Sequence, residues 1–151
     1  MATQLYMNNY TKQFQTEPPD LVSAADCQAA SRTIHDKVIT TADFNSGDVI
    51  YAARPPKGWK WGGRSTVIHR ALGANVTLAV GTGITGAGVA ANPTKFLPVM
   101  NSAAAGVKTC NVIENIGYEF DGETDVIITI GGADCATDIP IVAEFEFYAV
   151  N

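Results

Sequence analysis

Charge is scarce in this sequence. Only 17% of its 151 residues are Asp, Glu, Lys or Arg, against about 25% in an average soluble domain. Hydrophobic residues make up 46%, which is enough apolar content for a folded core and is not typical of a disordered chain. The net charge is −5, and this acidic balance disfavours duplex DNA and anionic membranes. We therefore predict no nucleic-acid partner and no membrane partner.

Cysteines and long apolar segments are also few. Cys27, Cys110 and Cys135 are odd in number and none are spaced as CxxC, which disfavours a disulfide framework or a zinc site. The longest apolar runs, such as Val126–Ile130, fall far short of the roughly 18 residues that span a bilayer. Met1–Tyr6 has neither the basic nor the apolar stretch of a secretion signal. We expect free thiols and synthesis in a reducing cytoplasm.

The N-terminal segment differs from the rest of the chain. Its first twenty residues are polar, with three spaced aromatic residues at Tyr6, Tyr10 and Phe14. Three rings cannot form a core of their own, so we expect them to dock on another surface. Ser23–Ala30 can form one short helix with Ser23 as its N-cap, although such a short helix needs packing to be stable. We predict that residues 1–32 form an extended arm.

From residue 33 onward the hydrophobic pattern has a period of two, as in half-buried strands. No helical stretch is long enough for a βαβ crossover, and Gly, Pro, Asn and Asp separate the segments. This spacing is typical of an all-β sandwich or barrel. We predict an all-β, jelly-roll-like antiparallel β-sandwich over residues 33–151. The expected strands are Thr33–Thr40, Asp48–Arg54, Arg64–Leu72, Asn75–Val80, Thr94–Met100, Val107–Ile113, Gly117–Phe120, Asp125–Ile130 and Ile139–Val150.

Two motifs could carry a ligand. Gly81–Gly86 matches GxGxxG, but a dinucleotide fingerprint also needs a following helix and an acidic residue about 20 positions on. Ala105 stands at that position, so we interpret the motif as a glycine loop. The alternating carboxylates of Glu119–Asp125 could bind Ca²⁺. Because Asp-Gly is a strong hairpin signal, we favour a turn at Asp121–Thr124 between two strands.

No pattern points to catalysis. His35 and His69 both fall inside expected strands, and neither GxSxG nor HExxH occurs. A small hydrolase built on either histidine is the enzymatic alternative, but it lacks a nucleophile motif. We predict that the protein is not an enzyme, with no catalytic residue, no metal ligand and no cofactor.

The stretch from Arg54 to Arg64 is the most distinctive, because it holds both tryptophans among several basic residues. Basic residues interleaved with aromatic rings can stack on sugars or nucleic acids. Trp and Arg are also enriched in interface hot spots. The third interpretation is a tight loop between strands, whose rings cover one end of the sandwich.

Two segments carry a resemblance to a known family. Gly47–Gly58 reads GDVIYAARPPKG and Val67–Gly81 reads VIHRALGANVTLAVG. A GDVI…PKG strand and loop, followed by a G-A-x-V-T-L-x-V-G hairpin, resembles the small structural proteins of tailed bacteriophages that decorate the head. The polar LY…N segment at the N-terminus is similar too. Trp59-Lys60-Trp61 replaces the small aliphatic residues usual in that family. The resemblance implies a β-sandwich or β-tulip fold that binds the shell as dimers or trimers.

The residues and the resemblance together predict a bacteriophage virion structural protein that binds and stabilises the capsid shell as a head decoration, or cement, protein. The expected partners are the major capsid protein and further copies of the chain in a dimer or trimer on the capsid exterior. The alternative is a carbohydrate- or receptor-binding β-sandwich module of a phage tail, and a tail or neck structural protein is a third possibility. The expected contact residues are Tyr6, Tyr10, Phe14, Trp59, Trp61 and Arg64.

Overall fold

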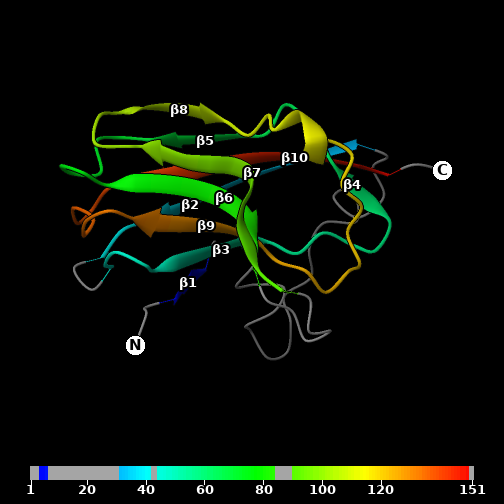
Figure 1. Cartoon of the computed structure of the whole chain (residues 1–151), viewed down its shortest axis with the longest axis horizontal. Coiled ribbons are helices and arrows are strands. Elements are labelled where there is room, and N and C mark those ends of the chain that lie inside the picture. The colour runs from blue at the N-terminus through cyan, green and yellow to red at the C-terminus, as the bar shows by residue number, and fades with distance from the viewer. Residues whose placement is uncertain (1–3, 7–30, 42–43, 84–89, 150–151) are drawn as a thin grey trace.

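The computed structural model describes residues 4–6, 31–41, 44–83 and 90–149. Ten strands in this part of the chain form two stacked sheets (Figure 1). The first sheet has the order β1 (Gln4–Tyr6), β3 (Val49–Ala53), β9 (Val126–Gly131), β6 (Thr77–Thr82) and β7 (Asn92–Asn101). The second has the order β2 (Ser31–Ile39), β10 (Pro140–Ala149), β5 (Thr66–His69) and β8 (Gly106–Thr109), with β4 (Trp59–Trp61) also beside β10.

Eight of these strands pair from the outside of the sequence inwards. β2 pairs with β10, β3 with β9, β5 with β8 and β6 with β7, always antiparallel. The pairs β10–β5 and β9–β6 then complete the two sheets. This nested order is that of a jelly roll. The prediction of an all-β, jelly-roll-like sandwich is confirmed. β1 adds a parallel edge strand to β3.

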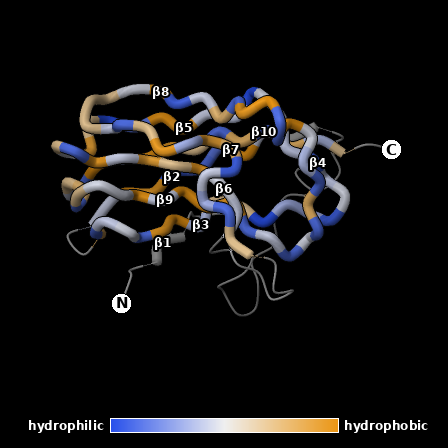
Figure 2. Tube along the Cα trace, in the orientation of Figure 1, coloured by the Kyte–Doolittle hydropathy of each residue, from blue (hydrophilic) through white to orange (hydrophobic). Residues whose placement is uncertain are grey.

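The core lies between the sheets and follows the period-two pattern of the strands. In β10, Ile141, Ala143, Phe145 and Phe147 are all buried, while the residues between them are half-buried. The first sheet contributes Ile50, Leu78, Val80, Ile128 and Ile130, each fully buried. Hydrophilic residues gather in the loops around β4 at the opposite end from the β7–β8 connection (Figure 2). Burial of the alternate residues therefore holds the sheets together.

Aromatic rings fill one end of this core. Trp61 in β4 is 1% exposed and stacks on Phe96 of β7, with ring centroids 4.0 Å apart and an interplanar angle of 12°. The rings of Phe145 and Phe147 lie 5.1 Å and 5.4 Å from the Trp61 ring. Offset-stacked and edge-to-face pairs of this kind add to the stability gained by burial alone. The cluster joins β4 and β10 of the second sheet to β7 of the first.

Several boundaries differ from the sequence-based expectation. The expected strand Val107–Ile113 ends at Thr109, and a 3₁₀ helix (Ile113–Asn115) follows. Arg64–Leu72 is a strand only over Thr66–His69, and β4 was not predicted. The segment Gly73–Asn75 turns the chain with positive φ at Gly73 and Asn75, and it joins β5 in one sheet to β6 in the other, so these two strands do not form a hairpin. The possible helix at Ser23–Ala30 lies outside the described residues.

The prediction of a hairpin around Asp121 is wrong about which strands pair. Gly117–Phe120 does not pair with Asp125–Ile130; instead it lies against β4, with a bridge between Lys60 and Glu119. The amide of Phe120 donates to the carbonyl of Trp59, and the amide of Gly58 donates to the carbonyl of Phe120.

Among the described residues, no helix has the length and apolar character of a membrane span.

Gly81 allows β7 to cross closely over β6. The register skips from Val80↔Leu97 to Thr82↔Asn92, so β7 bulges strongly at this point. A Cβ atom at Gly81 would collide with the carbonyl of Asn92 and with the backbone of Pro93. The first glycine of the GxGxxG motif therefore serves a close approach of two strands, which a side chain would prevent.

We expect Gly81→Ala to lower the free energy of unfolding by about 2 kcal/mol, because the obstructing atoms are backbone and cannot rotate away. Urea unfolding followed by circular dichroism measures this loss. Gly106→Ala is the matched control, since no atom lies within 4 Å of a Cβ placed there. An equal loss in both variants would show that the close approach is not the cause.

We expect Trp61→Ala to cost about 4 kcal/mol of unfolding free energy, because it leaves a large cavity against Phe96. Trp59→Ala removes a half-buried ring from the same strand and should cost about half as much or less. Thermal and chemical unfolding of the two variants gives the comparison. Equal losses would contradict the different burial of the two rings.

Candidate docking surface

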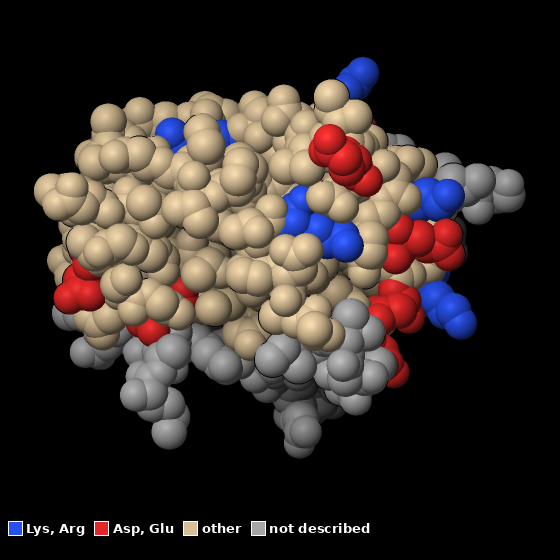
Figure 3. Space-filling view, viewed as in Figure 1, with Lys and Arg blue, Asp and Glu red and all other residues tan. Residues whose placement is uncertain are grey.

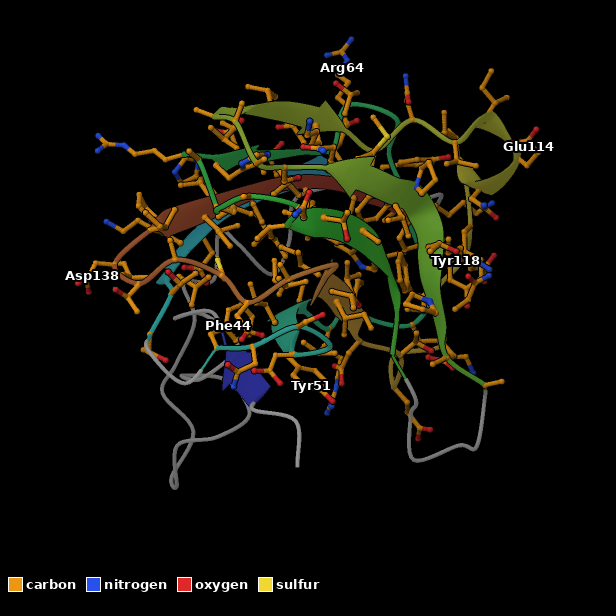
Figure 4. All side chains as sticks on the ribbon, turned by 60° about the vertical axis from the view of Figure 1, so that its left-hand side comes forward. Phe44, Tyr51, Arg64, Glu114, Tyr118 and Asp138 are labelled. Atoms are coloured by element: carbon orange, nitrogen blue, oxygen red, sulfur yellow. The ribbon has the colours of Figure 1, made fainter. Side chains whose placement is uncertain are left out.

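The structure separates the residues that were expected to contact a partner. Tyr6 lies in β1, whereas Tyr10 and Phe14 lie outside the described residues. Trp59 is half-buried against the core, and Trp61 is inside it. Arg64 is exposed, and Figure 4 shows its side chain pointing away from the body of the sandwich. Of the three residues expected in the Arg54–Arg64 stretch, Arg64 presents the most accessible side chain.

Hydrogen bonds to Glu146 fix the chain that carries Arg64. The amide of Gly62 donates to the Glu146 carbonyl at 2.8 Å, and the amide of Arg64 donates to Glu146 Oε2 at 3.2 Å. The Ser65 hydroxyl donates to the Gly62 carbonyl and accepts from the amide of Glu146. These hydrogen bonds hold the connection between β4 and β5, so that the two strands follow one another along the same side of β10. Arg64 is thus an exposed side chain on a well-held backbone.

The carboxylates near Gly122 have structural roles. Asp121 Oδ1 accepts hydrogen bonds from the amides of Glu123 and Thr124, at 2.8 Å and 2.7 Å. The guanidinium of Arg54 donates to both carboxylate oxygens of Asp125, from Nε at 2.8 Å and from Nη2 at 3.1 Å. No group of three or more potential metal ligands occurs within the described ranges. The turn at Asp121 is therefore held by its own backbone, as an Asx turn.

The histidines and cysteines lie in separate environments. His35 is on the outer face of the second sheet, with Nδ1 2.9 Å from Glu144 Oε1. His69 is buried, with Nδ1 2.8 Å from the carbonyl of Arg70. Burial raises the pKa of the Cys110 thiol to about 12 and also raises that of Cys135. A thiol that stays protonated at neutral pH is a poor nucleophile.

One side of the molecule is almost free of charge. From residue 71 to residue 107 the sequence contains a single charged side chain, Lys95. Its ammonium group lies 3.8 Å from the centre of the Tyr118 ring, which attracts a cation. This segment supplies β6, β7 and the connection to β8. Figure 3 shows the resulting face, on which charged groups are sparse: most lie towards the β4 end and the lower rim, and some blue groups lie near the upper edge.

The C-terminal part of β7 exposes apolar side chains on this face. Val99 is 60% exposed and Met100 is 41% exposed. β7 is the last strand of the first sheet in the described part of the chain, and Pro98 removes one amide from its free edge. We call Pro98–Asn101 the uncharged edge. It was not among the predicted contact residues, although the charge-free stretch is visible in the sequence.

Asp121 gives the turn a pH-dependent stability. Burial raises the pKa of its carboxyl, but the hydrogen bonds from Glu123 and Thr124 outweigh this and place the pKa below its ordinary value of 3.8. A carboxylate with a lowered pKa in the folded state stabilises the fold above pH 3.8 and loses this contribution as the pH falls through the folded value.

We therefore expect Asp121→Ala to lower the unfolding free energy by about 1 kcal/mol at pH 7, and by less at pH 3. Urea unfolding at the two pH values measures the difference. Glu123→Ala, in the same turn, retains the acceptor at Asp121 and serves as the control. A loss from Asp121→Ala that is the same at both pH values would contradict this role.

Comparison with known proteins identifies the fold. No protein-family model and no curated protein matches the chain. Among solved structures, a chain in the capsid of Ralstonia phage GP4 has a TM-score of 0.73 and 13% identity, with 99% of each chain covered. A chain in the capsid asymmetric unit of cyanophage Pam1 has a TM-score of 0.57 and 16% identity, and 85% of this chain and 98% of that chain are covered. The protein thus has a fold that occurs in the capsids of two phages.

Proposed function

We propose that the protein is a structural component of a phage virion that binds the assembled capsid shell and stabilises it, as a head decoration protein. The observation that carries the proposal is the likeness in fold to the chain from the GP4 capsid, over 99% of both chains. The two chains therefore consist of the same sandwich, with little added to either. The resemblance of Gly47–Gly58 and Val67–Gly81 to phage head proteins supports the same function.

The uncharged edge offers the chemistry that such binding needs. Apolar side chains such as Val99 and Met100 gain free energy when a partner covers them. Lys95, the single charged residue of the surrounding segment, lies over Tyr118. The partner proposed for this surface is the major capsid protein on the outside of the head. A protein that binds only the assembled shell stabilises it by mass action.

The contacts of the arm and of Arg64 belong to the same proposal. Tyr6, Tyr10 and Phe14 would add anchors from the N-terminal segment, and Arg64 and Trp59 would add contacts at the β4 end. Several weak attachments on one oligomer raise the effective concentration of each. Trp61 is omitted, because an indole that is 1% exposed has no surface left for a partner.

The tail-module alternative depended on Trp59 and Trp61 as a stacking platform. The ring of Trp61 is already stacked on Phe96 inside the core, so a sugar could reach only one of the two rings. An enzymatic function has no support from the described groups, because the contacts of His35 and His69 are to Glu144 and to the carbonyl of Arg70, and burial raises the pKa of the Cys110 and Cys135 thiols. Shell binding is the function that the exposed surface favours.

The test uses purified protein and expanded empty heads of the phage that encodes it. We expect the protein to bind these heads and to raise their resistance to heat or to a chelator. Val99→Glu should weaken binding about tenfold or more, because it places a charge in an apolar contact. Co-sedimentation measures binding, and the release of shell protein on heating measures protection.

Thr137→Glu is the matched control, since Thr137 is exposed on a loop that already carries Asp134 and Asp138. It should bind the heads as the unchanged protein does. Failure of the unchanged protein to bind any assembled form of the head would overturn the proposed function. Equal weakening by both variants would remove the uncharged edge from it.

A further inference from the structure

The second sheet exposes a row of apolar side chains on its outer face. The strand register pairs Val142 with Ile68, and Ile68 with Val107, so these three side chains lie side by side across β10, β5 and β8. One step along, Ile39 of β2 pairs with Pro140. Val107 is 58% exposed and Ile39 is 50% exposed. We call these five residues the apolar row.

The rest of this face is polar, as expected for the solvent side of an antiparallel sheet. Two residues from the row along each strand, Glu144 pairs with His35 and with Thr66. Thr66 in turn pairs with Thr109. The change from apolar to polar side chains occurs within one row of the register, and on β2 it occurs inside the row, because Lys37 pairs with Val142. The apolar row is therefore a bounded patch, of the kind that marks a protein–protein contact.

We infer that a second copy of this chain packs face to face on the apolar row, about a twofold axis that runs parallel to the strands between β10 and β5. This inference gives a surface and an axis to the homo-oligomer expected from the sequence, but it does not depend on shell binding. A twofold contact is isologous, so each residue contributes twice and in the same way from both copies. Sheets that stack with their strands nearly aligned are common in β proteins.

The side chains fit this arrangement. The rotation places β10 of one copy over β5 of the other, so that Val142 meets Ile68 of the second copy at two equivalent positions. Glu144 then faces the Thr66 hydroxyl of the second copy, which can donate a hydrogen bond to the carboxylate. β2 lies over β8 of the second copy, and the aliphatic stem of Lys37 covers Val107. No two like charges are opposed.

Charge also decides between the possible partners and axes. The outward side chains of β2 include the bases His35 and Lys37, whereas those of β10 include the acids Glu144 and Glu146. A partner surface of one sign would repel one of these strands. A twofold axis across the strands would bring Lys37 against Lys37 of the second copy. The axis along the strands avoids both penalties, so a second copy in that orientation fits this face best.

The experiment measures the molar mass of the purified full chain, by sedimentation and light scattering at tens of micromolar. We expect twice the chain mass of 15.9 kDa for the unchanged protein. Ile68→Glu should give the single-chain mass, because it places a carboxylate against Val142 of the second copy at both equivalent positions. Val99→Glu, on the uncharged edge of the other sheet, is the control and should keep the doubled mass.

Val142→Thr is the second variant, because it keeps a β-branched side chain and should fold normally. It should weaken dimerisation about tenfold, since the loss counts twice in an isologous contact. A single-chain mass for the unchanged protein would overturn the inference. So would a doubled or larger mass that survives both Ile68→Glu and Val142→Thr.

The two proposals fail in different ways. If the unchanged protein is a single chain and Ile68→Glu abolishes head binding, the apolar row belongs to the shell contact. The dimer is then overturned while the proposed function stands. If Ile68→Glu separates the dimer and no form of the protein binds heads, the dimer stands and shell binding is overturned.

Discussion

The structure depends on the pairing of β10 along both of its sides. Nine residues of β10 pair with β2 on one side, and on the other side β5 and β4 follow one another. This fixes which residues of four strands point inward, because directly paired residues share a face. Phe145 and Phe147 therefore meet Trp61 in the core. The same register aligns Val142 with Ile68 on the outside, so the core and the apolar row have one origin.

The hydrophobic and turn patterns of a single segment predicted the features of the fold that depend on that segment alone. The alternation in Ile139–Val150 was correct because one face of β10 is buried along nearly its whole length. Trp59 and Trp61 could not be told apart in the same way. β4 is three residues long, and both rings face the core side, because Trp59 and Trp61 pair with Ala149 and Phe147 on one face of β10, at the far end of the sequence. Trp61 is the more deeply buried of the two because Phe96 of the other sheet stacks on it. The Asp-Gly signal likewise placed a turn correctly but could not name Glu119's partner, Lys60 in β4.

The candidate contact surfaces also differ in how far one segment of the sequence reveals them. The charge-free stretch around β6 and β7 is continuous in the sequence, so its composition can be read directly, but its exposure cannot. Val99 is exposed because β7 ends the sheet, and that follows from strand order. The apolar row is assembled from Ile39, Ile68, Val107, Pro140 and Val142 on four strands. Each is an ordinary strand residue alone, and only the register makes them neighbours.

The positions of the two surfaces have a consequence for assembly. The apolar row is on the outer face of the second sheet, and the uncharged edge belongs to the first, so one contact does not cover the other. A twofold contact closes on itself and does not propagate into a filament. It would leave two copies of the uncharged edge at the outside of the pair. Two linked sites bind a repeating lattice more tightly than one, through effective concentration. The prolines of β7, Pro93 and Pro98, interrupt the free edge that would otherwise invite strand addition. Attachment would then rest on side chains and on the spacing of the pair, which suits a regular shell.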